Sequence, residues 1–457
     1  MKKKLLSVLL SVVMISALLT GCGGGSKDDK DTGAADTATN DTASDADKGT
    51  ADTADTAAAE PVTLTVWCWD PQFNIYSMNT AAEIYKTVNP NVTVDVVETA
   101  WDDIQTKLTT AVTSGQTDTL PDILLMQDNA LQKNVINYPD AFVDLTSSGI
   151  DFSQFAGFKT ALSSVNGANY GVPFDNGAAI SCLRTDVLEQ AGLTVNDFTD
   201  ITWDQFIEKG KTVLEKTGKP LLSNQAGSPD LLMMMMQSAG QWILNADGKP
   251  NFVDNPVLKE VVDTYVKLVK SGVLVEVNDW DQYVSSINSG TAAGAMNGCW
   301  IIGTIKTAAD QSGKWAITNI PKLNAEGASN YSSQGGSSWL ICANSKHQDA
   351  AIDFLKNTFA GSTELYEKIL PDTGALATYL PAGTSDAYAQ PQDFFGGDTV
   401  FSKITDYASK VPQVAYGVYN YEARDAIGTA ITKIVAGDDY DAAIKQAQSD
   451  VEFQIGQ

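Results

Sequence analysis

Aromatic and polar side chains stand at the ends of three predicted strands in the first third of the chain. Trp69-Asp70 ends the first strand, Thr99-Ala100-Trp101 follows the second and Asp128-Asn129 follows the third. In open α/β sheets ligands bind beyond the carboxyl ends of the strands. Indole faces beside carboxylate and amide groups form a surface for a sugar or another polar ligand. Core packing explains any single tryptophan equally well, so the coincidence at several strand ends carries the prediction.

Catalytic motifs are incomplete wherever the sequence approaches one. The only histidine, His347, precedes a predicted helix, and any Ser-His-Asp triad would have to use it. Gly335–Trp339 departs from G-x-S-x-G at its last position, and Gln205 replaces the first glycine of a P-loop ending at Gly210–Thr212. One histidine also argues against a transition-metal site. We therefore expect a binding protein without catalytic residues, cofactor or metal, with carboxylate-based glycoside hydrolysis as an open alternative.

The elements that position the strand-end residues are predicted from residue patterns. Val62–Trp69 is a continuous β-branched and aromatic run, which predicts a strand buried on both faces. Helical spacing follows at Ser77–Val88, and one further strand–helix alternation, Val92–Val97 and Trp101–Val112, leads to a strand at Ile123–Met126. This βαβαβ order indicates a parallel sheet with helices on both sides. Farther along, the four methionines Met233–Met236 are interpreted as a buried helix face rather than an adaptable ligand surface.

The stretch Tyr170–Leu188 is predicted to carry the chain from one α/β unit into a second. Val172-Pro173 must be extended, because proline disfavours the α region for the residue before it. Ala178–Leu183 is long enough for a short buried strand, so the polar patch Phe174–Gly177 lies between the two units and faces the gap between them. Two later crossings are expected, near Lys322–Gly327 and near Pro371–Gly374.

The first 60 residues differ in composition from the rest. Lys2–Lys4 precede the apolar run Leu5–Leu19, which is the layout of an export signal. Gly23–Glu60 contains no aromatic and no branched aliphatic residue, which predicts a disordered tether. Without residues 1–21, the chain holds 27 basic and 56 acidic residues, a net charge of about −29. Such acidity argues against nucleic acid as a partner.

Four cysteines lie beyond residue 22, each isolated in an apolar or strand-like run: Cys68, Cys182, Cys299 and Cys342. Buried free thiols are the favoured interpretation, because cysteine often serves as a small core hydrophobe. Oxidation in an exported protein is the alternative.

The order and spacing of several motifs resemble a known family. They are Leu64–Asp70, Thr113–Gly115 with Leu120–Leu124, Tyr170–Pro173, Ser289-Gly290 with Ala295–Trp300, Gly335–Ser337, Ser345-Lys346, Ala350-Ala351, Phe354-Leu355, and Gly437 with Ala442–Ile444. Together they resemble the extracellular solute-binding proteins of ABC importers, the maltose-binding-like cluster. In addition, Leu19–Cys22 resembles the lipobox of bacterial lipoproteins, and an ordinary signal peptide with an incidental cysteine is the alternative.

The resemblance implies an α/β, two-lobed periplasmic-binding-protein fold of type II. Each lobe would be a mixed sheet flanked by helices, with three hinge crossings between them. The implied segments are a signal peptide at 1–21, lipidated Cys22 with a disordered acidic tether at 22–60, an N-terminal lobe at 61–173 plus 325–372, and a C-terminal lobe at 174–324 plus 373–457.

A ligand site drawn from both lobes is implied as well. Its expected residues are Trp69, Asp70, Gln72, Trp101, Met126, Asp128, Asn129, Asp175, Asn176, Ser228, Asp230, Trp300, Gly336, Ser337 and Arg424. Pro71 and Arg424 depart from the family's usual pattern, which argues against maltose itself as the ligand.

The function implied by the resemblance is capture of a sugar or oligosaccharide for an ABC permease. The protein would be a monomer on the extracellular face of a bacterial membrane, anchored through Cys22. The first alternative is the same fold binding a non-sugar solute such as a peptide or polyamine. A surface enzyme or an adhesin is less favoured.

Overall fold

The computed structural model describes residues 60–414 and 416–456. The predicted signal peptide, Cys22 and all but the last residue of the predicted tether lie outside these residues. Within the described ranges, every helix is too short or too polar to cross a lipid bilayer.

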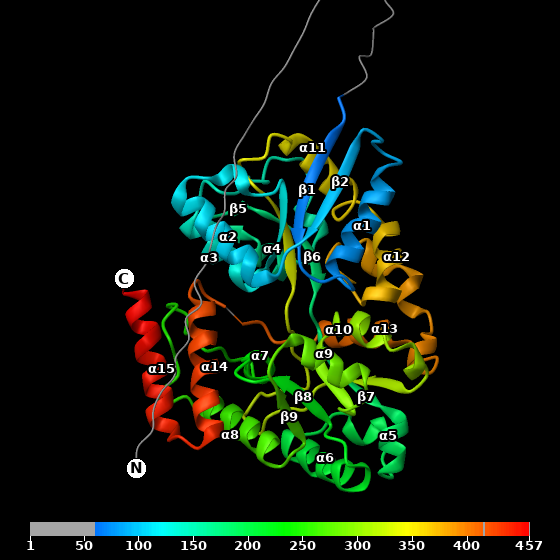
Figure 1. Cartoon of the computed structure of the whole chain (residues 1–457), viewed down its shortest axis with the longest axis vertical. Coiled ribbons are helices and arrows are strands. Elements are labelled where there is room, and N and C mark those ends of the chain that lie inside the picture. The colour runs from blue at the N-terminus through cyan, green and yellow to red at the C-terminus, as the bar shows by residue number, and fades with distance from the viewer. Residues whose placement is uncertain (1–59, 415, 457) are drawn as a thin grey trace, which may run out of the picture. The chain divides into compact units, whose positions relative to one another are not determined.

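A six-stranded sheet organises the first part of the chain (Figure 1). Its strand order is β13-β6-β12-β3-β1-β2. Strands β1, β2 and β3 pair in parallel, as predicted, whereas β12, β6 and β13 join in antiparallel directions. The strands span β1 Val62–Cys68, β2 Val92–Glu98, β3 Ile123–Gln127, β6 Gly171–Asn176, β12 Ser337–Ile341 and β13 Leu376–Ala377.

Helices cover both faces of this sheet. Those on one side pack against Leu64 and Val66 and are α1 Asn74–Tyr85, α11 Gln348–Asn357 and α12 Thr363–Thr373. Those on the other side pack against Leu124 and are α2 Trp101–Ser114 and α3 Asp128–Asn137. The short elements nearby are α4 Gly157–Leu162, β4 Ser164–Val165 and β5 Ala168–Asn169.

Strand β1 is less buried than its composition suggests. Leu64, Val66 and Cys68 are fully buried, but Thr65 and Trp67 between them are only half-buried. The prediction of burial on both faces was therefore wrong for this strand. The Lys107 amine lies 5.1 Å from the Trp67 ring centroid, so a charged side chain rather than an apolar one stands over this ring.

A second, antiparallel sheet has the order β10-β7-β11, with β7 at Ala179–Arg184, β10 at Gly294–Gly298 and β11 at Trp315–Thr318. Beside it, β8 Leu222–Gln225 and β9 Leu274–Val277 pair in parallel. The backbone N–H of Ala293 donates to the Pro220 carbonyl oxygen at 2.8 Å, which connects the three-stranded sheet to the β8–β9 pair.

Two apolar clusters hold the second sheet between its helices. One cluster packs α9 Trp280–Asn288, α10 Ile301–Lys306 and α13 Val400–Ala408 against the sheet. The larger one contains α5 Thr185–Gln190, α6 Trp203–Thr217, α7 Asp230–Ser238, α8 Pro256–Lys270, α14 Asn420–Ala436 and α15 Tyr440–Ile455. Met233–Met236 lie on α7 and are all buried in this cluster, so their interpretation as a core helix face is confirmed.

The chain passes from the first sheet to the second between β6 and β7. β6 ends at Asn176 in the first sheet, and β7 begins at Ala179 in the second. The backbone of Gln334 donates to Gly177 at 2.7 Å, so the returning chain runs alongside this crossing. Gly177 has no room for a side chain, because an added Cβ would stand 2.2 Å from the Gln334 carbonyl oxygen.

The segments Lys322–Gly327 and Pro371–Gly374, where two later crossings are predicted, each stay with the elements before them. Lys322 still donates its backbone N–H to Ile201 at 3.0 Å, and the chain enters the first sheet only at β12. Likewise, Pro371–Gly374 forms the end of α12, and β13 beyond it still pairs with β6. Glycine and proline mark turns locally, while the partner strand of a segment lies far away in sequence.

Candidate ligand-binding site

Three aromatic rings line up across elements that are distant in sequence. Trp69 follows β1 and lies 5.3 Å from the Trp101 ring at the start of α2, measured between ring centroids. Trp101 lies 6.3 Å from the ring of Tyr421 on α14. We call Trp69, Trp101 and Tyr421 the aromatic cluster. All three are partly exposed, so the cluster offers flat apolar surface on which a sugar face could stack.

Tyr421 was missed by the sequence analysis, although it holds the cluster together. Its hydroxyl accepts a hydrogen bond from the Trp101 indole nitrogen at 3.1 Å and donates to the Gln127 side chain at the end of β3. A single tyrosine in a predicted helix has no distinguishing signal. Only its position, three residues before Arg424 on the same helix, could have suggested it.

An ion pair stands beside the aromatic cluster. The Arg424 guanidinium lies 5.5 Å from the Tyr421 ring centroid and pairs with Asp230 at the start of α7. The Arg424 Nε atom is buried and has no hydrogen-bond partner within the described residues. A buried donor without a partner costs free energy, which a ligand oxygen would recover. The structure thus brings Asp230 and Arg424 together with Trp69 and Trp101, as a shared site requires.

Asp70 and Gln72 are held by the turn after β1. Asn74 accepts backbone N–H groups from both Trp69 and Asp70 at 3.0 Å, and Asp70 accepts the backbone N–H of Gln72 at 2.8 Å. Burial raises the pKa of Asp70, while the backbone N–H groups of Gln72 and Phe73 act to lower it. The Gln72 side chain is exposed at the outside of this turn.

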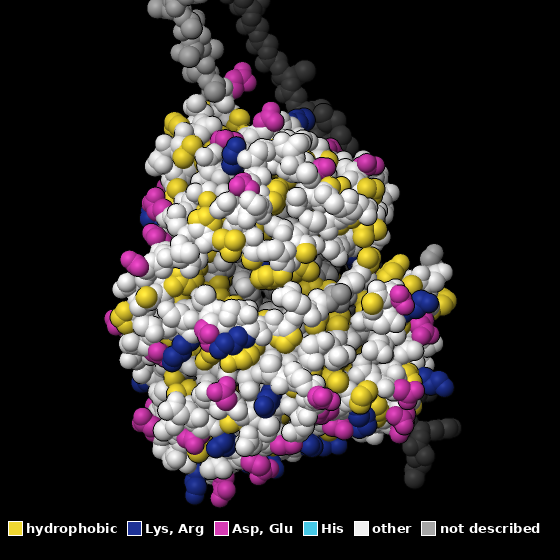
Figure 2. Space-filling view, turned by 180° about the vertical axis from the view of Figure 1, so that it is seen from behind, with side chains coloured by type: hydrophobic (Ala, Val, Ile, Leu, Met, Phe, Trp, Pro, Cys, Tyr) yellow, Lys and Arg dark blue, Asp and Glu magenta, His cyan; other side chains and the backbone are white. Residues whose placement is uncertain are grey.

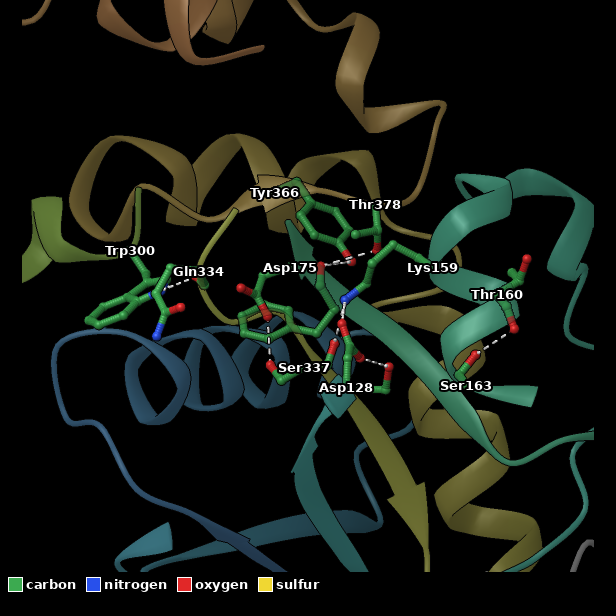
Figure 3. Close-up of polar contacts among 12 residues, drawn as sticks. Asp128, Lys159, Thr160, Ser163, Asp175, Trp300, Gln334, Ser337, Tyr366 and Thr378 are labelled. Atoms are coloured by element: carbon green, nitrogen blue, oxygen red, sulfur yellow. Dashed lines mark hydrogen bonds and ion pairs between the residues drawn. The ribbon is translucent and has the colours of Figure 1, made fainter. Parts of the chain in front are cut away.

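A second group of predicted residues forms a buried polar network that we call the carboxylate cluster (Figure 3). It consists of Asp128, Lys159, Asp175, Ser337 and Ser338. Lys159 on α4 forms an ion pair with Asp128, and Ser338 donates to the other oxygen of Asp128 at 2.9 Å. Ser337 donates to Asp175 at 2.6 Å. Lys159, which the sequence analysis missed, is the only cation in this set and faces two carboxylates.

The carboxylate cluster is buried in the fold and does not form an open surface. Asp128, Asp175 and Ser337 are each at most 4% exposed. Burial raises the pKa of Asp175 to about 6, while the nearby Lys159 charge and the Ser337 hydroxyl act to lower it. We therefore propose that these residues position the strand ends, and contact of Asp128, Asp175 and Ser337 with ligand stays a prediction.

Gly336 lies against the same cluster. Its φ angle is +99°, and a Cβ added there would stand 2.6 Å from an oxygen of Asp128. Its carbonyl oxygen accepts the backbone N–H of Asp128 at 3.0 Å. Glycine is required here both for the backbone conformation and for the close approach.

Trp300 packs against the cores of both sheets and is partly exposed. Its indole nitrogen donates to the Gln334 carbonyl oxygen at 2.9 Å, on the second crossing (Figure 3). The ring of Trp280, 40% exposed, lies 5.9 Å away. Trp280 is a further aromatic surface that the sequence analysis did not include.

The remaining predicted residues take different positions. Met126 is completely buried among aliphatic side chains, so we no longer propose it as a ligand contact. Asn176 and Ser228 are partly exposed, and the Ser228 hydroxyl accepts the backbone N–H of Asp230 at 3.4 Å. Asn129 retains a buried amide oxygen without a partner in the described residues, which suits a ligand hydroxyl.

Tyr416, also missed, is influenced by Asp128 of the carboxylate cluster and by Arg424 of the ion pair. Burial raises its pKa, the Asp128 charge raises it further, and the Arg424 charge lowers it.

The face of the molecule opposite to that of Figure 1 carries a hollow with hydrophobic side chains along it (Figure 2).

Among the described residues, Cys68, Cys182, Cys299 and Cys342 are buried and free. The favoured interpretation of buried thiols is thus confirmed. Burial raises the pKa of each of these thiols.

Comparison with known proteins agrees with this arrangement. The family model described as bacterial extracellular solute-binding protein matches residues 80–396. A lactose-binding protein of Rhizobium radiobacter is 42% identical over 392 residues, which are 86% of this chain and 93% of that protein. The chain therefore belongs to the bacterial extracellular solute-binding proteins, which confirms the predicted family and its class, a binding protein and not an enzyme.

Solved structures share the fold at low sequence identity. The GacH receptor of Streptomyces glaucescens, solved unliganded and with acarbose, has a TM-score of 0.73 at 17% identity, with 86% of this chain and 97% of that one covered. The transporter-associated binding protein of B. animalis subsp. lactis in complex with β-1,6-galactobiose also has a TM-score of 0.73, at 20% identity, with 85% and 96% covered. The predicted α/β periplasmic-binding-protein fold is thereby confirmed.

Proposed function

We propose that this protein captures a short oligosaccharide outside the cell and presents it to an ABC permease, with a galactosyl disaccharide such as lactose as the first candidate. The lactose-binding relative, at 42% identity over most of both chains, supports this choice of sugar. The departures at Pro71 and Arg424 from the maltose-binding pattern are consistent with it.

The observation that carries the proposal is the aromatic cluster beside the Arg424–Asp230 pair. Pyranose rings have apolar C–H faces and polar edges, so they need flat aromatic surface next to charged hydrogen-bonding groups. Trp69 and Trp101 offer the aromatic surface, and Arg424 and Asp230 offer the charged hydrogen-bonding groups. The unpartnered Nε of Arg424 adds a donor for a sugar oxygen.

The finer parts of the proposal concern the assembly around the ligand. The protein acts as a monomer with two lobes. We place the boundaries between the lobes at residues 177–178, at residues 332–336 and after residue 379, in place of those that the family resemblance implies. Cys22 carries the lipid that holds it at the extracellular face of the membrane, because two acyl chains are enough for stable anchoring. Nucleic acid is not a partner of so acidic a chain.

Titration calorimetry with lactose, β-1,6-galactobiose, maltose and an arabino-oligosaccharide tests the ligand. We expect micromolar or tighter binding of a galactosyl disaccharide, and at least tenfold weaker binding of maltose. Chromatography of the same mixtures should recover every saccharide uncleaved. Binding of a peptide or polyamine in place of all four sugars would contradict the proposal.

Membrane fractionation tests the anchor. Full-length protein should fractionate with membranes, and Cys22→Ala should release it into the soluble fraction. Cys68→Ala is the matched control, because that thiol is buried in the folded domain. An unchanged distribution of the Cys22→Ala variant would contradict lipid anchoring.

A further inference from the structure

A large cavity lies on the far side of Tyr421 from the Arg424–Asp230 pair. Its volume is about 660 Å³, within the range of about 300–1,000 Å³ that small-molecule sites occupy. Its lining residues come from α2, α3, α14 and α15 and include Asp102, Gln105, Tyr421, Asp425, Thr429 and Phe453. We call it the outer cavity. Trp69, Trp101, Asp230 and Arg424 do not line it.

Helix geometry explains how Tyr421 borders both spaces. At 3.6 residues per turn, Arg424 lies about 60° to one side of Tyr421 around the α14 axis. Asp425 and Thr429 lie about 40° and 80° to the other side. The tyrosine ring therefore stands between the ion pair and the outer cavity.

Three contacts fix this ring in place. Its hydroxyl bonds to Trp101 at 3.1 Å and to Gln127, and the Arg424 guanidinium lies over its face at 5.5 Å. The hydroxyl contacts connect α14 to α2 and to the end of β3. A side chain whose hydroxyl has two partners and whose face is covered by Arg424 keeps one orientation.

The outer cavity has the chemistry of a saccharide subsite. Carboxylates at Asp102, Glu422, Asp425 and Asp450, amides at Gln105 and Gln454, and hydroxyls at Thr429 and Ser449 line it. Such groups bond sugar hydroxyls as donors or acceptors. Phe453, 69% exposed, adds an aromatic face.

We propose that Tyr421 determines the length of the bound saccharide by closing one end of the ligand site against the outer cavity. This inference rests on the proposed sugar-binding function. In this proposal the disaccharide lies on the inner side of the ring, against Trp69 and Trp101. A longer chain extended toward α14 meets the ring, although polar space of suitable size lies behind it.

Calorimetric affinities for three probes test the proposal. The probes are lactose and two tetrasaccharides, one that extends lactose at its non-reducing end and one that extends it at its reducing end. In the wild-type protein at least one tetrasaccharide should bind tenfold or more weakly than lactose. In Tyr421→Ala the same tetrasaccharide should come within threefold of lactose, because the chain can enter the outer cavity.

Two further variants separate the wall from the hydroxyl contacts. Tyr421→Phe keeps the ring and should retain the tenfold discrimination, even if both affinities fall. Phe453→Ala, added to Tyr421→Ala, should again weaken the tetrasaccharide while leaving lactose unchanged. Circular dichroism and melting curves confirm that each variant is folded.

Several outcomes would overturn the inference. If the wild-type protein bound lactose and both tetrasaccharides with equal affinity, the inference would be overturned, while the proposed function would stand. If folded Tyr421→Ala still bound the tetrasaccharide tenfold more weakly than lactose, the inference would be overturned and the proposed function would stand. Failure of the wild-type protein to bind any saccharide would overturn the proposed function, and the inference with it.

Discussion

Trp101 and Tyr421 are 320 positions apart in sequence, yet the indole nitrogen of one donates to the hydroxyl of the other at 3.1 Å. Trp101 begins α2, which packs on the first sheet, and Tyr421 lies on α14, which packs in the largest core of the second half. Lys133 on α3 and Glu422 on α14 form an ion pair in the same region. These contacts can exist only while the two halves are closed upon each other.

Closure should respond to ligand. A ligand that contacts both halves binds the closed form more tightly and so increases its population. We expect saturating lactose to reduce the radius of gyration in small-angle X-ray scattering. Trp101→Phe, which removes the indole N–H, should enlarge the unliganded particle and weaken lactose binding. A radius of gyration that is the same with and without lactose would instead indicate a rigid groove.

Trp300 should contribute a stacking surface. Its indole nitrogen is already bonded to Gln334, so the ring orientation is fixed and its exposed face is available to a sugar. We expect Trp300→Ala to weaken lactose binding tenfold or more, which corresponds to about 1.4 kcal/mol. Loss of less than threefold would assign Trp300 to core packing. Trp315→Ala is a control for general destabilisation, because that indole is 1% exposed in the second sheet and bonds to Gln311 at 2.9 Å.

The carboxylate cluster should make stability depend on pH. Because burial raises the pKa of Asp175 from 3.8 to about 6, the folded state holds a proton that the unfolded state releases between these values. The contribution of Asp175 to stability is therefore complete below pH 4 and is lost as the pH rises through 6. We expect Asp175→Asn to gain about 1–3 kcal/mol relative to wild type between pH 4 and pH 7.5.

Thermal unfolding at a series of pH values measures this difference. The exposed Asp140→Asn is the matched control, and its melting temperature should follow that of the wild type at every pH. A constant difference between Asp175→Asn and wild type across the range would show that Asp175 does not titrate there.

Gly336→Ala should destabilise the fold more than a positive φ angle alone requires. The added methyl group meets Asp128 at 2.6 Å in a backbone conformation with φ of +99°. Gly167 has φ of +82° and nothing within 4 Å of an added Cβ, so Gly167→Ala isolates the conformational cost. We expect Gly336→Ala to cost at least about 1 kcal/mol more in chemical denaturation. Equal costs would mean that the cluster shifts to accept the methyl group.

The sequence by itself determined the local elements and the class of protein. Thr202 caps α6 through Gln205, and Asn255 caps α8 ahead of Pro256, as such residues predict. These signals work because the interacting groups are within four residues of each other. The βαβαβ order of the first lobe and the family motifs were equally readable, since both are patterns along the chain.

Only the tertiary structure decided which of the candidate residues share a site. The sequence shows Asp128 and Asp175 as polar groups at strand ends, but the ion pair of Lys159 with Asp128 and the Lys159 charge near Asp175 depend on α4 packing over them. The sequence carries no signal at Tyr421, because its hydrogen-bond partners lie about 300 positions away. Contacts across such distances depend on how the elements pack, and side-chain type and local spacing carry no record of that packing.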